Sequence, residues 1–253
     1  MISQEIILIF LKSKSLVSTF STKFTNFGAE QMIKENIMKK FAIFLSGCGV
    51  SDGAEIHEAV MTMLAVDKFD CIYDIFAPDI PQAHVINHLT GEVSNEKRNV
   101  LVEAARIARG KIKNASEFDA GKYDALIFPG GFGVAKNFCT YAFDGIKCSV
   151  NPVVEKAIKD MHKAGKPIGA MCISPVLITR VLGQVTTTIG TDASTARDLE
   201  KMGGHHIESS IAEVVSDRVN KIFTTPCYML NSRISEIALG AENLIKTILN
   251  FIQ

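Results

Sequence analysis

Residues 167–182, PIGAMCISPVLITRVL, contain a short apolar run that passes directly into a helix-forming stretch. Pro167–Met171 has the length and apolar content of a buried strand. Ser174 and Pro175 then supply a helix start, because serine suits the cap and proline the first helical position. Cys172 stands at the junction. The segment therefore predicts a sharp strand-to-helix turn that presents one cysteine.

A thiol at the start of a helix meets the positive end of the helix dipole. This position favours the thiolate and predicts a Cys172 pKa below the usual value of about 8.5. We therefore expect Cys172 to be a nucleophile. The alternative is a buried structural cysteine, which is the commoner fate of a single cysteine. The choice between the two depends on the neighbouring motifs.

A second motif follows another predicted strand, Ala125–Phe128, and reads Pro-Gly-Gly-Phe-Gly. Ligands of open α/β sheets bind at the carboxyl ends of the strands. Gly130 and Gly131 lack side chains, so their backbone N–H groups can approach a substrate oxygen. Together with the N–H of Ile173 they are expected to form an oxyanion site for a tetrahedral adduct on sulfur. Taken alone, such a loop is also typical of a simple turn.

A third motif, DGAEIHE at residues 52–58, begins the helix predicted after the first strand. We expect Glu55 to offset the helix dipole at a solvated helix start. Glu58 lies three residues further on, on the same helical face. A Glu58 carboxyl group beside Cys172 could accept the thiol proton and later move a proton on the adduct. His57 is expected to point elsewhere.

Strands alternate with helices along the chain, which predicts a mainly parallel, doubly wound α/β sheet. With no internal repeat and no linker, residues 39–253 are expected to form one domain. The predicted strands are 41–45, 71–77, 125–128, 167–171, 185–189, 212–215 and 222–225. The predicted helices are 55–66, 95–109, 151–163, 174–182, 195–202 and one from residue 232.

Composition excludes several classes of protein. Of the 253 residues 47% are hydrophobic, which suffices for a large core, and 27 basic residues balance 27 acidic ones. Because these charges balance, the chain has no net electrostatic attraction to nucleic acid or to an anionic membrane. No apolar run approaches the roughly 20 residues of a membrane span. The six cysteines are scattered without a CxxC pair, which indicates a reducing compartment.

The first 38 residues differ from the rest of the chain. They are rich in Ser, Thr, Phe and Lys and poor in acidic residues before Glu30. This composition predicts a mitochondrial transit peptide, although such leaders usually carry arginine. The alternative is a disordered or misannotated extension before Met38 and a cytoplasmic protein. Glu5 and the lack of a small-residue cleavage site disfavour a secretory signal.

The remaining cysteines and histidines give weaker signals. Cys48 and Cys227 follow or adjoin strand ends, so they are candidates for the same cleft, with small-residue packing as the alternative. The pairs His84 with His88 and His205 with His206 lack a third ligand at a recognisable spacing. We therefore predict neither a metal nor a cofactor.

Seven motifs in order resemble one family: SGCGVSDGAEIHEAV, VINHLTGE, RNVLVEAARIARG, DALIFPGGFGVAKN, GKPIGAMCISP, TIGTD and NKIFTTPCYML. Residues 39–251 are similar to the ElbB-type, glyoxalase-like relatives of the PfpI and class I glutamine amidotransferase superfamily, which include mitochondrial members in animals. The resemblance implies a flavodoxin-like fold, Cys172 as nucleophile and Glu58 as its carboxyl partner. It also implies Gly131 and Ile173 as oxyanion donors and cofactor-independent conversion of 2-oxoaldehydes to hydroxy acids, sometimes described as deglycation.

One departure from the superfamily pattern concerns histidine. Related amidotransferases and deglycases place a histidine beside the cysteine, whereas Thr188 and Ile189 stand in the comparable run VTTTIGTD. Amidotransferase triad chemistry is therefore not expected. Glu58 alone, His57 or Asp192 remain as substitutes.

Two classes of function follow from these residues. The first is an enzyme, a glyoxalase III-like lyase that acts on a small-molecule carbonyl substrate through a Cys172 hemithioacetal. The second is a non-catalytic redox-sensing or metabolite-binding stress protein, in which Cys172 is reversibly oxidised. Nucleic acid and membranes are not expected as partners, and analogy with the fold predicts a homodimer.

Overall fold

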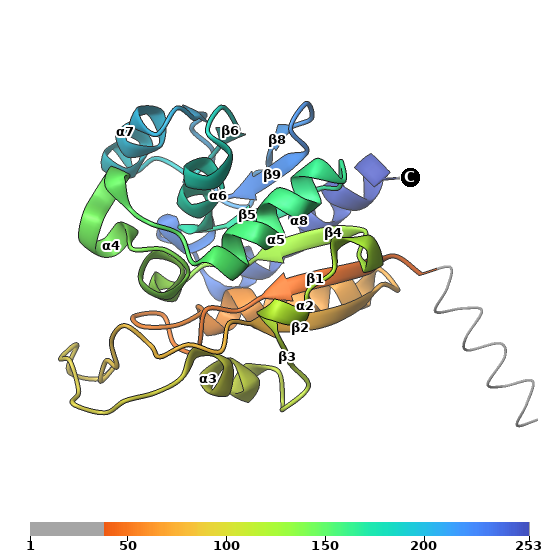
Figure 1. Ribbon diagram of the computed structural model, residues 1–253. Coiled ribbons are helices and arrows are strands. Elements are labelled where there is room, and N and C mark those ends of the chain that lie inside the picture. Colours follow the sequence, from red (N-terminus) through yellow and green to blue (C-terminus); the bar gives the residue numbers. More distant parts are fainter. Residues whose placement is uncertain (1–37, 253) are drawn as a thin grey trace, which may run out of the picture. The chain divides into compact units, whose positions relative to one another are not determined.

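The central sheet begins with an apolar strand, β1, whose side chains are almost all buried. In the computed structural model, which describes residues 38–252, seven strands form one sheet in the order β3-β2-β1-β4-β5-β9-β8 (Figure 1). Neighbouring strands are parallel, except that β8 runs antiparallel to β9. The strands of this sheet are β1 Lys40–Phe44, β2 Ile72–Ala77, β3 Lys113–Asn114, β4 Ala125–Phe128, β5 Ile168–Met171, β8 Val215–Asp217 and β9 Ile222–Thr225.

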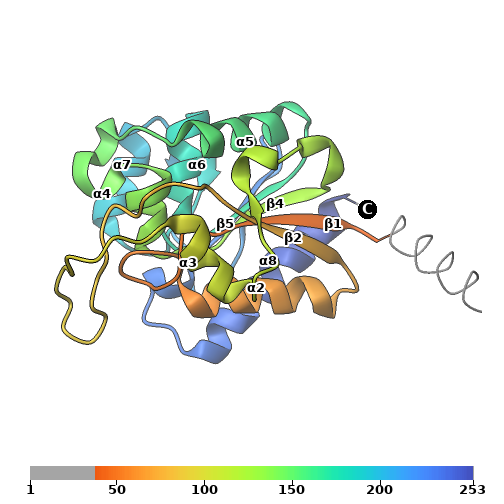
Figure 2. The same cartoon turned by 60° about the horizontal axis from the view of Figure 1, so that its bottom comes forward.

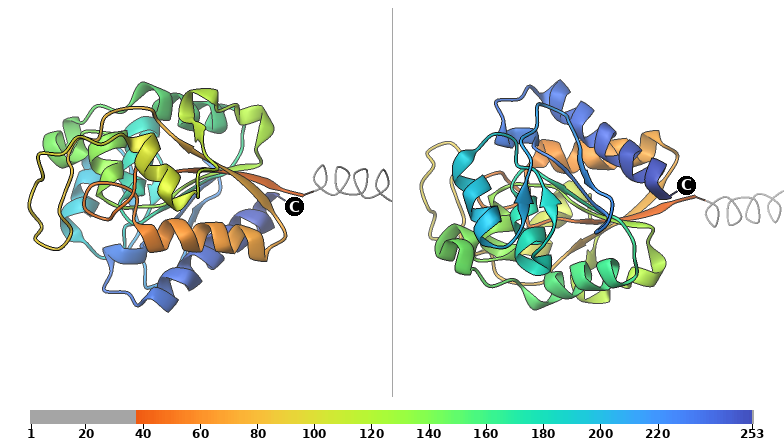
Figure 3. Two further views of the ribbon diagram at one scale, coloured as in Figure 1. Left: turned by 90° about the horizontal axis from the view of Figure 1, so that it is seen from below. Right: turned by 90° about the horizontal axis from the view of Figure 1, so that it is seen from above.

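Helices cover both faces of the sheet. Figures 2 and 3 show α2 and α8 side by side on one face, with α5 and α6 on the other. The core is accordingly divided into two layers, one that includes α2, α3 and α8 and one that includes α5 and α6. The helices are α2 Ile56–Lys68, α3 Val100–Ile107, α4 Tyr141–Asp144, α5 Pro152–Lys163, α6 Ser174–Leu182, α7 Ala193–Lys201 and α8 Ile234–Ile252.

This architecture confirms the predicted doubly wound, mainly parallel α/β fold. A compact unit begins at Lys39. The predicted leader lies outside the described residues, apart from Met38. No helix among residues 38–252 is long and apolar enough to cross a membrane.

The helix predicted from residue 95 begins only at Val100. The Asn99 side chain accepts the Val102 N–H and caps the helix. Residues just before it pair instead with the segment after β2, because the Gln82 N–H donates to the Arg98 carbonyl at 2.8 Å. The prediction was wrong over residues 95–99, where capping and a long-range backbone bond outweigh apolar periodicity.

The strand predicted over residues 185–189 does not join the main sheet. Only Thr186–Thr187 (β6) is extended, and it pairs with His205–His206 (β7) as a separate two-stranded sheet. Ile189 packs instead with Val176 and Leu199 in a small cluster below α7. The β-branched run therefore predicted an extended segment correctly, but it did not predict that this segment joins a separate two-stranded sheet.

The order of the strands reverses between β1 and β4. From β1 the chain builds the sheet towards β2 and β3, and from β4 it builds towards β5 and β9. Loops at the carboxyl ends of β1 and β4 therefore diverge at this point, which is where open α/β sheets bind ligands. Glu58 lies on the helix after β1, and Cys172 directly follows β5.

Candidate active site

Cys172 occupies the predicted turn between β5 and α6. Its φ of 57° lies in the left-handed region that residues with a side chain rarely adopt. Two long-range hydrogen bonds hold the turn: the Cys172 N–H donates to the Thr225 carbonyl at 3.0 Å, and Ser174 Oγ donates to the Pro129 carbonyl at 2.8 Å. The sheet thus forces the cysteine into a strained elbow, a conformation that clusters at functional sites.

Cys172 is 8% exposed as a residue and is therefore almost enclosed by the protein. The backbone N–H groups of Gly131 and Ile173 favour the thiolate, since both lower the pKa of Cys172. These two amides are the predicted oxyanion donors. They stand next to the thiol, where an oxygen on a carbon bound to sulfur would develop charge.

Glu58 is fully buried on α2, and its carboxyl group lies close to the Cys172 thiol, because a Cβ on Gly130 would be 2.6 Å from Glu58 Oε2 and 3.0 Å from Cys172 Sγ. Its Oε2 accepts the N–H of Gly130 at 2.8 Å, and its Oε1 accepts the N–H of Tyr228 at 3.2 Å. Two backbone donors therefore fix the carboxyl group in place. Burial, followed by the charge of Glu55, raises the pKa of Glu58 to about 7.

The pKa of Cys172 is raised, which corrects the prediction of a lowered value. Burial of the thiol is the largest cause and the charge of Glu58 the second, while the Gly131 and Ile173 amides act in the opposite direction. The helix start was correctly predicted, but desolvation and a buried carboxylate outweigh its dipole. Just above pH 7 the Glu58 carboxyl group is therefore ionised while the Cys172 thiol keeps its proton.

Gly130 and Gly131 both have to be glycine, for different reasons. A Cβ on Gly130 would lie 2.4 Å from the Cys172 Cβ and 2.6 Å from Glu58 Oε2. Gly131 has a φ of 99°, and a Cβ there would lie 2.3 Å from the Glu55 nitrogen. The Gly130 N–H already donates to Glu58, so its predicted role as an oxyanion donor is wrong. Gly130 instead permits the close approach of Cys172 and Glu58.

The loop after β4 is joined to the loop that precedes α2. The Glu55 N–H donates to the Gly130 carbonyl at 2.9 Å, and the Gly133 N–H donates to the Gly53 carbonyl at 2.9 Å. Glu55 also caps α2, because its carboxylate accepts the Glu58 N–H at 2.7 Å. Glu55 is only 7% exposed, so the expectation of a solvated helix start was wrong although its position at the helix start was right.

Of the other candidate residues, Cys227 comes closest to the pair. It is buried, and the charges of Glu58 and Cys172 add to burial in raising its pKa. His57 is exposed on the outer side of α2, and its Nδ1 lies 2.9 Å from the Tyr228 hydroxyl. Neither residue is hydrogen-bonded to the Cys172 thiol in the part of the chain that the structure describes.

Two further candidates lie in other surroundings. The half-buried Cys48 has Glu103, Arg106, Asp52 and Arg98 as its charged neighbours. Asp192 is exposed and caps α7, with its Oδ1 accepting the Thr195 N–H at 2.7 Å. Of the candidates Glu58, His57 and Asp192, Glu58 is the one whose carboxyl group lies beside the Cys172 thiol at Gly130.

Comparison with known proteins identifies the family of this chain. A scan of protein-family models returned no match. A Rattus norvegicus protein named ES1 protein homolog, mitochondrial, is 44% identical over 220 residues, which cover 83% of each chain. A Homo sapiens protein named glutamine amidotransferase-like class 1 domain-containing protein 3, mitochondrial, is also 44% identical over 220 residues, covering 83% of this chain and 82% of that one.

The chain belongs to the ES1 family of class I glutamine amidotransferase-like proteins. The predicted superfamily is thereby confirmed. So is the mitochondrial location predicted from the first 38 residues, since both of these ES1-family relatives are named as mitochondrial proteins.

Solved structures support the same assignment. An isoprenoid biosynthesis protein with an amidotransferase-like domain from Ehrlichia chaffeensis has a TM-score of 0.80 at 38% identity, covering 85% of this chain and 100% of that one. Glyoxalase III from Candida albicans has a TM-score of 0.54 at 16% identity, covering 83% and 97%, and shares the fold. The ES1-family chain therefore has the predicted flavodoxin-like fold of this superfamily.

Sequence reasoning missed some functional groups of this ES1-family site. Tyr228 contributes a backbone N–H to Glu58, and Thr225 holds the Cys172 elbow through its carbonyl. Both belong to the motif NKIFTTPCYML, which marked the family but carries no side-chain chemistry that would reveal these roles. Among residues 38–252 no group of three or more His, Cys, Asp or Glu side chains is arranged to hold a metal ion.

Proposed function

We propose that Cys172 and Glu58 convert a small 2-oxoaldehyde to the corresponding 2-hydroxy acid without a cofactor. The observation that carries this proposal is the close approach of the Cys172 thiol and the buried Glu58 carboxyl group at Gly130. A nucleophile, an acid–base group and two oxyanion donors are the parts that this reaction class needs.

The first step joins the aldehyde to sulfur. The thiol proton of Cys172 passes to the Glu58 carboxylate, and the thiolate attacks the aldehyde carbon. The carbonyl π electrons move to oxygen, which the Gly131 and Ile173 amides stabilise. Glu58 then returns its proton to that oxygen, leaving a neutral hemithioacetal and a carboxylate.

The second step moves hydrogen between adjacent carbons. The Glu58 carboxylate takes the proton from the former aldehyde carbon, a C=C bond forms, and the charge moves to the oxygen of the neighbouring carbonyl. The hydroxyl proton on the former aldehyde carbon passes to that oxygen, and Glu58 gives its proton to the neighbouring carbon. The product is the thioester of a 2-hydroxy acid on Cys172. Water cleaves the C–S bond, which restores the thiol and releases the acid, so that one water is consumed and no redox partner is needed.

The raised pKa of Glu58 suits this role. A general base works best when its pKa lies near the working pH, and burial brings that of Glu58 to about 7. The Gly130 and Tyr228 amides keep both oxygens in fixed positions, so that proton transfer needs no movement of the side chain.

Two further facts support the substrate class. Cys172 is only 8% exposed and Glu58 is fully buried, which favours a substrate of a few heavy atoms. The fold is shared with a protein named glyoxalase III from Candida albicans, and this analogy of fold is a further reason to propose the conversion of 2-oxoaldehydes.

The test measures turnover of glyoxal and methylglyoxal by the full-length protein in deuterated buffer. We expect glycolate and lactate as products, with deuterium on the carbon next to the carboxylate because Glu58 exchanges its proton with solvent. Cys172→Ser is expected to abolish turnover, and Cys48→Ser, which alters a cysteine outside the pair, is expected to retain it. Full activity of Cys172→Ser would contradict the proposal.

A second candidate is a non-catalytic role as a redox-sensing or metabolite-binding protein. It is favoured by one observation: of the histidines in the described part of the chain, none is hydrogen-bonded to Cys172. Mild peroxide treatment followed by peptide mass spectrometry tests it. Sulfenic acid on Cys172 at low peroxide dose, with no turnover of either aldehyde, would favour this role over the enzyme.

A further inference from the structure

The edge of the sheet next to β2 is incomplete. β3 pairs only with Phe76 and Ala77, at the carboxyl end of β2. The first part of β2, Ile72–Ile75, has no strand on that side among residues 38–252. A gap therefore remains beside the amino-terminal half of this edge.

Backbone hydrogen bonds show which residues of β2 face the gap. The Ile72 N–H donates to the Lys39 carbonyl, and the Leu45 N–H donates to the Phe76 carbonyl. In a parallel pair successive residues bond to opposite sides, so the even-numbered residues of β2 face β1. The N–H and carbonyl of Tyr73 consequently face the gap.

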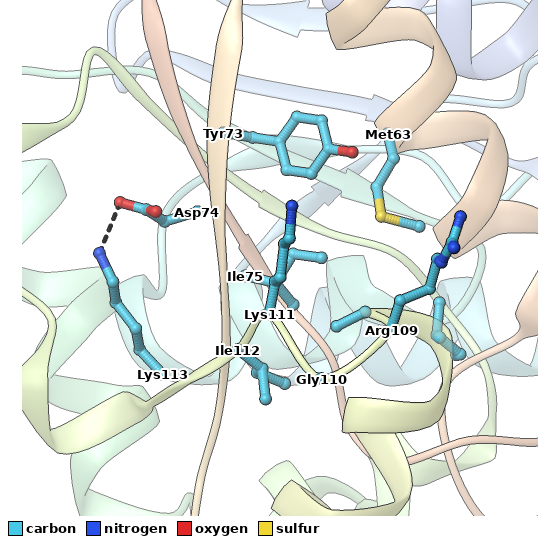
Figure 4. Close-up of a pocket in the computed structure, with 11 residues that line it drawn as sticks. Met63, Tyr73, Asp74, Ile75, Arg109, Gly110, Lys111, Ile112 and Lys113 are labelled. Carbon is cyan, nitrogen blue, oxygen red and sulfur yellow. Dashed lines mark hydrogen bonds and ion pairs between the residues drawn. The ribbon is translucent and has the colours of Figure 1, made fainter.

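The connection from α3 to β3 bounds the other side of the gap. Beyond α3 the chain turns through two left-handed residues, Arg109 with a φ of 52° and Gly110 with a φ of 77°. Between this turn, β2 and α2 lies a cavity of about 860 Å³ (Figure 4). That volume is within the range of small-molecule sites, roughly 300–1,000 Å³.

One part of the cavity wall is apolar. It consists of side chains from α2, β2, α3 and the connection after α3, namely Met63, Ile75, Ile107 and Ile112. Ile75 belongs to the main core, and the other three are partly buried against that core. An apolar wall of this kind gains free energy by covering an apolar ligand.

The other part of the wall is cationic. Figure 4 shows Tyr73, Lys111 and Arg109 with their polar ends directed towards the same space. Burial, followed by the charge of Asp67, raises the pKa of Tyr73, so its hydroxyl stays protonated and can donate. Tyr73, Arg109 and Lys111 therefore offer three hydrogen-bond donors to one ligand.

The charges in the wall do not cancel. Asp74 is the one carboxylate in the lining, and it is occupied by Lys113 at 2.9 Å, by Lys40 at 2.8 Å and by the Tyr123 hydroxyl at 2.7 Å. Arg109 and Lys111 form no ion pair within 4 Å among the described residues. The three cations of the lining thus face a single carboxylate that is already shared.

A purely structural explanation accounts for only part of this arrangement. Cations after the end of a helix stabilise it through the dipole, and Arg109 follows α3 directly. The dipole explains neither the apolar wall nor the convergence of Lys111 and Tyr73 on the same space. A ligand that combines an anionic group with an apolar body matches all three features.

We propose that this cavity binds an amphipathic anion, a carboxylate or phosphate carried on an aliphatic or aromatic body. Its anionic group contacts Arg109, Lys111 and the Tyr73 hydroxyl, and its body covers Met63 and Ile107. The site is separate from the Cys172 site, because it adjoins the amino-terminal half of β2, whereas Cys172 follows the carboxyl end of β5.

The test is isothermal titration of the full-length protein with octanoate and with octyl phosphate, which distinguish the two anionic groups. Octylamine and octanol serve as ligands with the same chain but without negative charge. The double variant Arg109→Gln with Lys111→Gln removes both unpaired cations. Its matched control, Lys97→Gln with Lys147→Gln, removes the same charge at exposed positions outside the lining.

We expect saturable binding of at least one anion, weakened at least tenfold in the Arg109/Lys111 variant and less than twofold in the control. Met63→Glu is expected to abolish binding by repulsion, while Met63→Gln, of similar size, retains it. Three outcomes would overturn the proposal: no saturable binding of either anion, equal binding by the Arg109/Lys111 variant, or equal binding of octylamine.

Discussion

The Glu58 carboxyl group and the Cys172 thiol approach each other at Gly130 inside the core, although they belong to elements far apart in the sequence, α2 and the turn after β5. Burial raises the pKa of both groups, and the charge of Glu58 raises that of Cys172 further, because little solvent is left to stabilise a second negative charge. The position of their shared proton therefore determines whether sulfur or oxygen carries the charge, and this relationship leads to four predictions.

Glu58→Gln is expected to separate thiol reactivity from turnover. The charge of Glu58 raises the Cys172 pKa, so its removal lowers that pKa and speeds alkylation of Cys172 by iodoacetamide near pH 8. Loss of the acid–base group should reduce aldehyde turnover by about 10²–10⁴-fold. Peptide mass spectrometry across pH measures the first effect, with the exposed Glu208→Gln as control. Unchanged alkylation would show that the two groups do not interact.

The free energy of unfolding is expected to depend on pH through the ionisation of Glu58. Its folded pKa of about 7 lies above the ordinary value of 4.5, so the folded chain holds this proton more tightly. The resulting stabilisation is complete below pH 4.5 and is lost as pH rises through 7. Denaturant unfolding from pH 5 to 8 should show Glu58→Gln gaining stability relative to wild type by up to a few kcal/mol. A constant difference across this range would contradict the raised pKa.

Gly130→Ala is expected to disrupt the site sterically. The added Cβ would overlap the Cys172 Cβ and Glu58 Oε2, at 2.4 and 2.6 Å, and would push the two groups apart. We expect turnover to fall at least about 100-fold, because displacements of about 1 Å have effects of that size. Gly121→Ala, whose Cβ would meet only the Asp119 carboxylate at 3.1 Å, is the control. Near-normal turnover by Gly130→Ala would argue against a catalytic role for the close approach of Cys172 and Glu58.

His57→Gln is expected to change the reaction little, by less than about threefold, because His57 contacts Tyr228 and not the thiol. Wild-type kcat/KM should rise as pH increases through about 7, since Glu58 must be ionised to take a proton. The variant should keep this midpoint. A loss of the midpoint with His57 would identify the histidine as the base.

The sequence was informative wherever local chemistry determines structure. Pro167–Met171 and Ser174-Pro175 predicted the elbow, and the boundaries of β4, α6 and β9 were predicted without error. Motif resemblance, and not spacing, paired Glu58 with Cys172. That pairing depends on the packing of α2 beside the turn after β5, two elements far apart in the sequence, for which the local sequence contains no signal.

The errors share a physical origin in long-range contacts. The Cys172 pKa was predicted from a helix dipole, a local property, whereas the observed direction depends on burial by distant segments. The Gly130 N–H was expected to bind a substrate oxygen, but it donates instead to the Glu58 carboxylate, 72 residues away in the sequence. The start of α3 was the exception, because Asn99 is a typical helix-capping residue that could have been recognised from the sequence alone.

The strained elbow at Cys172 depends on bonds to Thr225 and Pro129, both remote in sequence. A chain threaded unfolded through a translocation channel has neither bond, and its Cys172 is an ordinary thiol beside no carboxylate. The proposed reactive centre therefore requires the pairing of β5 with β9, which only the folded chain has. For a mitochondrial protein, folding after import would confine the proposed chemistry to the compartment where the chain matures.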